Sequence, residues 1–116
     1  MRKILGGGMR QAGFLAAAGI YALQNHIERL KDDHTHAKQI ACALQKKNFI
    51  KMFLPVETNL IIFEMNDTMT APAFVEKLKE KNILGIAITP SRVRLVVHLD
   101  ITKEMVHKTV EIIDKL

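Results

Sequence analysis

Along the first third of the chain, apolar residues recur among polar ones with the spacing of a helix. Residues 9–23 are rich in alanine and predict a helix, and residues 26–46 predict a long amphipathic helix. Asn25, with Glu28 three residues later, is typical of a helix N-terminus. Two helices in tandem and one bent helix fit this pattern equally well. The apolar or small positions of the second helix are Ile27, Leu30, Ala37, Ile40, Ala41 and Leu44.

Later in the chain the spacing changes to that of strands. The dense apolar run at 59–65 predicts a strand, as do residues 83–89 and 92–99. A further short strand is expected near 49–54. Because Pro90 and Ser91 interrupt the last two runs, we expect these to pair as a hairpin.

Two further helices are predicted from their first residues. Thr70 is a good N-cap and places Pro72 in the first turn, and Thr102 begins the last helix. The order of elements predicts an α+β fold, in which a small, largely antiparallel sheet is covered by helices. We expect connecting helices over 1–46, with inter-domain or oligomer contacts, and a small α+β domain over 47–116.

Composition excludes few classes of function. The chain has 116 residues, a net charge of +5 and 48% hydrophobic residues. Excess positive charge suits anions, nucleic acid or membrane surfaces, but charge alone favours a basic solvated surface, and no RNA-recognition motif is present. The apolar run at 13–23 is too short to span a bilayer. The only cysteine, Cys42, excludes a disulfide framework, predicts a cytoplasmic location, and is expected to be a core thiol.

The alternation over 92–99 separates a core face from a polar face. The polar face carries two guanidinium groups and an imidazole, and a guanidinium matches a carboxylate with two parallel hydrogen bonds. A solvated face without a ligand explains the same pattern. The core set is Val93, Leu95, Val97 and Leu99; the opposite set is Arg92, Arg94, Val96 and His98.

Three glycines lie between basic residues at the N-terminus. The segment GGGMRQAG is neither a dinucleotide fingerprint, because Gln11 stands where the last glycine belongs, nor a Walker loop. Glycines that lead into a helix expose backbone N–H groups to an anion, and Lys3 and Arg10 flank them. A plain helix start with a flexible lead fits the same residues.

The segment DDHTH at 32–36 suggests metal ligands, but its spacing argues against a site. His34 and His36 diverge by about 200° around a helix and cannot share one ion. Asp32 and His36 can meet, but two ligands make a weak site at best. We therefore expect no metal, and we expect His34, which lies on the apolar stripe, to be a hydrogen-bonded interface histidine.

Three segments together resemble the L-threonine aldolases, which are pyridoxal-phosphate (PLP) enzymes of the β-eliminating lyase group. The first segment is RKILGGGMRQAGFLAAAGIYAL (2–23), the second is ETNLIIF (57–63), and the third is RLVVHLD (94–100). Their order and spacing match over almost the whole chain. The third departs from the usual R-L-V-T-H-x-D by having Val97 at the threonine position.

The resemblance implies the C-terminal part of an aspartate-aminotransferase fold. It places Lys3 and Arg10 near the cofactor phosphate, across a subunit interface of a homo-oligomer, and Arg94 on the substrate carboxylate. The implied reaction is the retro-aldol cleavage of threonine or allo-threonine to glycine and acetaldehyde, with PLP as the electron sink. It implies an amino-acid substrate and no nucleic-acid or membrane partner.

The family's Schiff-base lysine lies upstream of the glycine motif, and no lysine of this chain occupies a matching position. We therefore expect that this chain alone neither holds PLP covalently nor turns over threonine, and it contributes no catalytic residue. The alternative is a non-enzymatic basic α+β module that binds an anion, nucleic acid or a protein partner.

Overall fold

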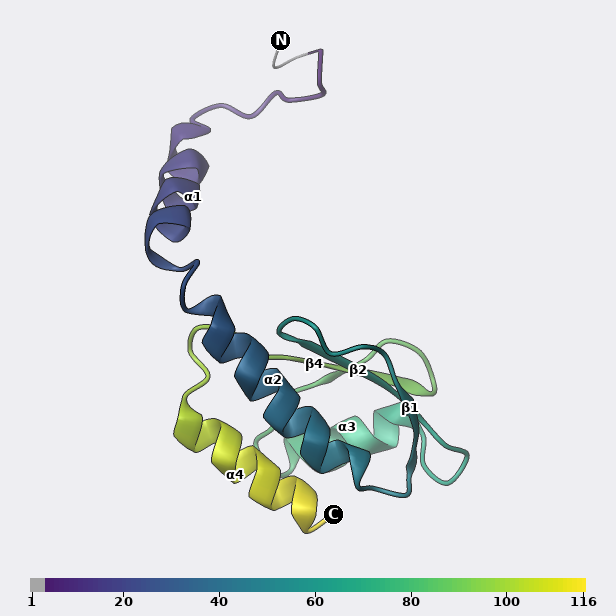
Figure 1. Ribbon diagram of the computed structural model, residues 1–116. Coiled ribbons are helices and arrows are strands. Elements are labelled where there is room, and N and C mark those ends of the chain that lie inside the picture. Colours follow the sequence, from purple (N-terminus) through teal and green to yellow (C-terminus); the bar gives the residue numbers. More distant parts are fainter. Residues whose placement is uncertain (1–3) are drawn as a thin grey trace. The chain divides into compact units, whose positions relative to one another are not determined.

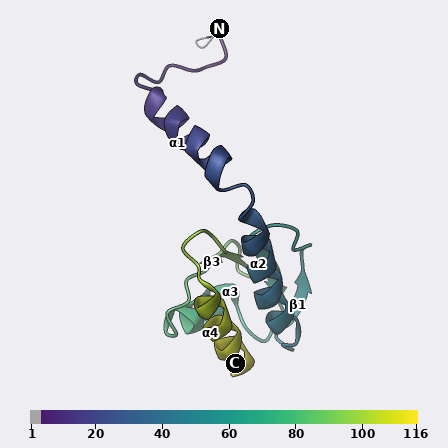
Figure 2. The same cartoon turned by 60° about the vertical axis from the view of Figure 1, so that its left-hand side comes forward.

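A computed structural model describes residues 4–116 of the chain. The residues fall into two compact units, one that ends at Leu30 and one from Lys31 to Leu116 (Figures 1 and 2). The sheet and three of the four helices belong to the second unit. The division at residue 46 stays a prediction, although the buried face of the helix before it packs in the same core as the sheet.

The first unit contains one helix, α1, over Gly13–Asn25. The helix is rich in alanine, but none of its residues is buried. Even the large side chains of Phe14 and Tyr21 are exposed. The interpretation of Asn25 as the start of the next helix is wrong: it is the last residue of α1, and its Nδ2 donates a hydrogen bond to the Tyr21 carbonyl oxygen at 2.8 Å. The structure therefore has two helices in tandem.

Helix α2 runs over Leu30–Gln45, and its buried face differs from the predicted stripe. Ile27 and Leu30 are exposed, and His34 is half-buried, with no side-chain hydrogen bond within residues 4–116. The buried arc is wider and rotated because α2 packs beside α4 as well as on the sheet (Figure 1). It comprises Asp33, His36, Ala37, Ile40, Ala41, Ala43 and Leu44.

The predicted antiparallel sheet is confirmed. Its strands are β1 (Ile50–Phe53), β2 (Leu60–Met65), β3 (Ile86–Ala87) and β4 (Arg92–Val96), in the order β1-β2-β4-β3. Every neighbouring pair is antiparallel, and β3 and β4 form the predicted hairpin. The register of β1 shifts between its first and third residues, which marks a bulge beside the edge.

Helices α3 (Ala71–Lys79) and α4 (Lys103–Asp114) begin where the capping residues predict. The Thr70 hydroxyl accepts a hydrogen bond at 3.4 Å from the amide three residues later, and Thr102 does the same at 3.3 Å. Pro72 lies in the first turn of α3, where its missing N–H leaves no helical hydrogen bond unmade.

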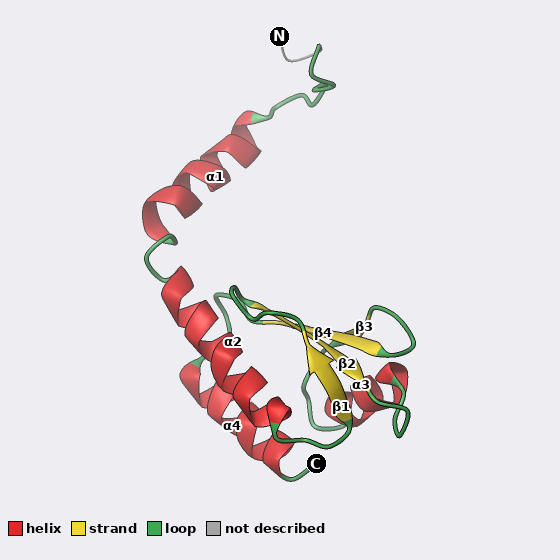
Figure 3. Ribbon diagram, turned by 45° about the vertical axis from the view of Figure 1, so that its right-hand side comes forward, coloured by secondary structure: helices red, strands yellow, loops and turns green. Residues whose placement is uncertain are grey.

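Helices α2, α3 and α4 cover one face of the sheet, and the other face is open (Figure 3). Four phenylalanines form the centre of the core. Phe74 of α3 packs against Phe63 of β2 edge to face, with ring centroids 5.8 Å apart, and against Phe49 at 5.4 Å. Phe53 packs against Phe63 at 5.4 Å. These rings supply the bulk that a chain without tryptophan needs.

Strand β4 ends earlier than the alternation predicts. Val93, Leu95 and Val97 are buried as expected, but Leu99 is 52% exposed. The strand stops at Val96, and the amide of Ile101 then bonds back to the His98 carbonyl oxygen at 2.9 Å, which turns the chain away from the sheet. Alternation along a strand therefore no longer predicts which side chains are buried at Leu99, which lies beyond the end of β4.

Cys42 is exposed on α2, so the expectation of a core thiol is wrong. Its neighbours Ala41 and Ala43 are both buried, so the edge of the buried face of α2 passes between adjacent residues. Among the residues that the structure describes, none of the helices combines the length and the apolar character that crossing a lipid bilayer requires.

Candidate functional site

Arg94 lies at the middle of the open face of the sheet. It is opposite Ile62 of β2 and opposite Ile86 of β3, so strands flank it on both sides. Its neighbours along β4, Val93 and Leu95, point into the core. The alternation that buries these two residues therefore presents the arginine on the opposite face, as the sequence predicts.

Within residues 4–116, the Nε atom of the Arg94 guanidinium lacks a hydrogen-bond partner. The residue is half-buried, and its Nε atom is buried. A buried N–H donor without an acceptor is costly, by about 1–3 kcal/mol, and the cost is larger for a charged group. A carboxylate that approaches in the plane of the guanidinium would satisfy Nε and one terminal nitrogen together.

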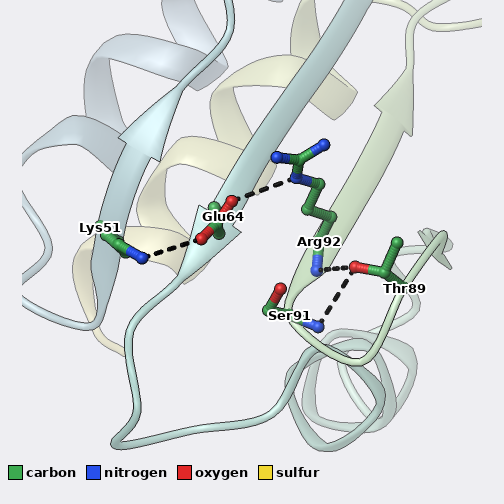
Figure 4. Close-up of polar contacts among 5 residues, drawn as sticks. All are labelled: Lys51, Glu64, Thr89, Ser91 and Arg92. Carbon is green, nitrogen blue, oxygen red and sulfur yellow. Dashed lines mark hydrogen bonds and ion pairs between the residues drawn. The ribbon is translucent and has the colours of Figure 1, made fainter.

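Figure 4 shows an ion-paired cluster of Lys51, Glu64 and Arg92. Because Arg92 and Arg94 are two residues apart on β4, the cluster lies on the same sheet face as Arg94. Glu64 of β2 accepts a hydrogen bond from Lys51 Nζ through Oε1, and one from Arg92 Nε through Oε2, each at 3.1 Å. The hydrogen bonds from Lys51 and then from Arg92 hold the pKa of Glu64 below its ordinary value. Glu64 is thus a carboxylate shared by two cations.

The turn before β4 fixes where Arg92 begins the strand. The Thr89 hydroxyl accepts hydrogen bonds from the amides of Ser91 at 3.3 Å and Arg92 at 3.0 Å (Figure 4). The Ser91 carbonyl oxygen accepts from the Met65 amide at 2.7 Å, which ties the turn to β2. These bonds set the position of the backbone that carries both arginines.

Arg10 belongs to the first unit and is exposed. It precedes α1, which begins at Gly13, four residues later than predicted. Gly6 and Gln11 adopt positive φ angles of 80° and 50°, so this lead is a set of turns rather than the first turn of the helix. Lys3 lies outside the described residues.

The histidines and the cysteine form no further centre. His36 is buried, with Nδ1 lacking a partner in the described residues, whereas Cys42 and His107 are exposed. His107 Nδ1 lies 3.4 Å from Glu111 Oε1 on the same helix. Among residues 4–116, no group of three or more His, Cys, Asp or Glu side chains is arranged to hold a metal ion.

Asn59 makes a structural contact that the sequence analysis did not predict. It lies in ETNLIIF, just before β2, and its Nδ2 donates to the Val97 carbonyl oxygen at 2.7 Å. The Val97 amide in turn donates to the Asn59 carbonyl oxygen at 2.9 Å. An asparagine next to a strand end is the one signal that could have suggested such a bond.

Known proteins resemble the chain in sequence and in fold. The beta-eliminating lyase family matches residues 1–68. Low-specificity L-threonine aldolase 1 of Arabidopsis thaliana is 43% identical over 94% of the chain, and the low specificity L-threonine aldolase of Escherichia coli strain K12 is 44% identical over 89%. The crystal structure of the ornithine aminotransferase of Toxoplasma gondii matches 76% of the chain with a TM-score of 0.63 and 26% identity.

These matches also measure how much of each relative the chain represents. The chain spans 31% of the Arabidopsis protein, 29% of the E. coli protein and 22% of the aminotransferase. The aminotransferase likeness confirms the expected fold class, and the family match covers more than half of the 116 residues. The chain belongs to the beta-eliminating lyase family.

Proposed function

We propose that this chain is the C-terminal part of a PLP-dependent threonine aldolase and supplies its binding site for the substrate carboxylate. The observation that carries the proposal is Arg94, a half-buried arginine on the open sheet face whose Nε has no partner within residues 4–116. The names of the similar proteins support the reaction, which cleaves threonine or allo-threonine to glycine and acetaldehyde.

Arg94 binds the carboxylate and orients the amino acid. Its position between two strands restricts the backbone, so little conformational freedom is lost when the ligand binds. Two parallel hydrogen bonds from a planar guanidinium fix both the distance and the rotation of a carboxylate. Fixing the carboxylate also fixes the direction of the bond between Cα and Cβ. In this way the chain helps to select which bond of the substrate breaks.

PLP, when bound, supplies the electron sink for the negative charge that develops on Cα. Arg10 fits a place near the phosphate because it is an exposed cation in the turns before α1. We propose Arg10 and Lys3 for that place, with both contributed across a subunit interface. Phosphate carries up to two negative charges, so two cations match it.

The proposal extends to the whole protein. Because the chain spans only about 30% of its relatives, the Schiff-base lysine and most of the PLP pocket are assigned to the remainder. We propose a homo-oligomer, which α1 supports because all of its apolar side chains are exposed within the described residues. A cytoplasmic location is proposed on the single cysteine.

A chimera tests the reaction. The matching segment of the E. coli relative is replaced by this chain, and glycine formation from threonine is measured with added PLP. Arg94→Ala is expected to raise KM by at least tenfold, while Arg94→Lys, which keeps the charge but not the fork, recovers part of the loss. Lys79→Gln, which removes one positive charge from an exposed side chain of α3, is the control. Unchanged kinetics in Arg94→Ala would reject the assigned part.

A further inference from the structure

Two arginines project from the same face of β4 but differ in their partners. Arg92 and Arg94 are two residues apart, so their Cα atoms are separated by about 6.6–6.8 Å along the strand. Arg92 donates from Nε to Glu64 at 3.1 Å, whereas the Nε of Arg94 has no partner among the described residues. The face therefore holds one guanidinium that is ion-paired and one whose Nε lacks a partner among the described residues.

Glu64 is well placed to keep Arg92 in an ion pair. Its side chain is only 15% exposed, and each of its carboxylate oxygens accepts a hydrogen bond from a different cation (Figure 4). Lys51 approaches from the edge strand and Arg92 from the neighbouring strand. A carboxylate engaged on both sides has little freedom to move away and leave Arg92 to another anion.

We propose that Glu64 makes the open sheet face selective for ligands that carry a single carboxylate, because its ion pair occupies Arg92 and leaves Arg94 to bind the carboxylate. The inference rests on the proposed carboxylate site at Arg94. It adds a residue that touches no ligand in that proposal and acts through its ion pair with Arg92.

A dicarboxylate is disfavoured for two reasons: its second carboxylate lacks an attraction, and it also meets a repulsion. A dicarboxylate whose first carboxylate sits on Arg94 finds no unpaired cation at Arg92, and its second carboxylate meets the negative charge of Glu64. Without that charge, two guanidiniums separated by two residues would match two carboxylates joined by a short carbon chain. Removal of one carboxylate thus converts a one-anion face into a two-anion face.

Butyrate and succinate test this selectivity on the chain itself. Both acids have four carbons, and they differ in the second carboxylate. Binding is followed by NMR through the Nε–Hε signals of Arg92 and Arg94. In the native chain we expect both anions to shift the Arg94 signal, with butyrate bound more tightly than succinate because the second carboxylate of succinate is repelled by Glu64. In Glu64→Gln, succinate should bind about three- to fivefold more tightly, the size of one exposed ion pair, and butyrate should change less than twofold.

Two controls separate local from general charge effects. Glu76→Gln removes a carboxylate that pairs with Lys79 on the solvent-exposed side of α3, so it changes the net charge equally and should leave the ratio of the two affinities unchanged. In Glu64→Gln, the further change Arg92→Gln should abolish the gain for succinate. If Glu64→Gln does not fold, Glu64→Thr keeps a residue suited to a strand and serves in its place.

The outcomes distinguish this inference from the proposed function. If neither anion shifts the Arg94 signal in the native chain, the carboxylate site itself is rejected. If both bind at Arg94 but the variants at Glu64 leave the ratio unchanged, only the selectivity is rejected. A native chain that binds succinate at least as tightly as butyrate would also overturn it.

Discussion

Asn59 and Val97 are joined by two hydrogen bonds, one from the Asn59 side chain at 2.7 Å and one from the Val97 amide at 2.9 Å. The pair lies just beyond the last residue of β4, where the ladder with β2 has ended. It therefore extends the pairing of the two strands past their regular ends. Because β4 carries Arg94, the clamp also holds the candidate site in place.

The first prediction concerns this clamp. Asn59→Ala leaves the Val97 carbonyl oxygen without its side-chain donor in a partly buried position. We expect the free energy of unfolding to fall by about 1–2 kcal/mol, measured by urea denaturation. Asn48→Ala, at an exposed asparagine, should change it by less than about 0.5 kcal/mol. Equal effects of the two substitutions would contradict the assignment.

The second prediction concerns Gly85, which packs against the buried side chain of Leu95. A Cβ at this position would lie 2.6 Å from Leu95 Cδ2. Gly85→Ala should therefore destabilise the protein by about 1–2 kcal/mol, despite the reduced entropy of the unfolded chain.

A double-mutant cycle checks the cause. Leu95→Val removes the clashing methyl group, so in that background Gly85→Ala should become neutral or slightly stabilising. A coupling energy near zero would show that the strain at Gly85 has another source.

The third prediction concerns the N-cap of α4. Thr102 accepts the Met105 amide, and its hydroxyl is also the main cause of the lowered pKa of Glu104. Thr102→Ala should cost about 0.5–2 kcal/mol of stability and move the pKa of Glu104 back toward 4.5. Thr102→Ser should preserve both. NMR titration of the Glu104 carboxylate, with thermal unfolding of each variant, measures the two effects together.

The fourth prediction concerns pH. The pKa of Glu64 is lowered in the folded state, first by Lys51 and then by Arg92. The ionised form is therefore favoured by folding, and its contribution is fully present above the ordinary pKa of 4.5 and is lost as the pH falls through the lower, folded value. Glu64→Gln should flatten the loss of stability between pH 5 and about pH 3.

Lys51→Met gives the matching test of the cause. It removes the first contributor to the lowered pKa of Glu64, so that pKa should rise further than in Lys79→Met, which changes a lysine on the opposite side of the sheet. For the fourth prediction itself, an acid unfolding transition of Glu64→Gln identical to that of the native chain would contradict the contribution of ionised Glu64 to stability.

Much of the architecture could be predicted from local patterns. The Thr70 cap and Pro72 fixed the start of α3, and the alternation around Arg94 placed its side chain on the face opposite Val93 and Leu95. These features depend on residues close in sequence, whose effect survives in any tertiary context. The carboxylate assignment of Arg94 stays a proposal.

The remaining features depend on contacts between distant segments. The buried face of α2 could not be located from one helix, because it is set by packing against both the sheet and α4, and so His36 is buried and Cys42 is not. The Glu64 cluster joins three strands, with Lys51 and Arg92 separated by 41 residues (92 − 51). The sequence alone offers no reason to bring those side chains together.

The two outer strands of the sheet have a consequence for aggregation. On one side, β3 has only two residues, and on the other, β1 has a bulge and carries Lys51 next to it. A short strand offers few free backbone groups, and a bulge with a charge disrupts the regular template that another chain needs for pairing. Fibril growth by edge-to-edge addition is therefore opposed at both ends, even though one broad face of the sheet is uncovered.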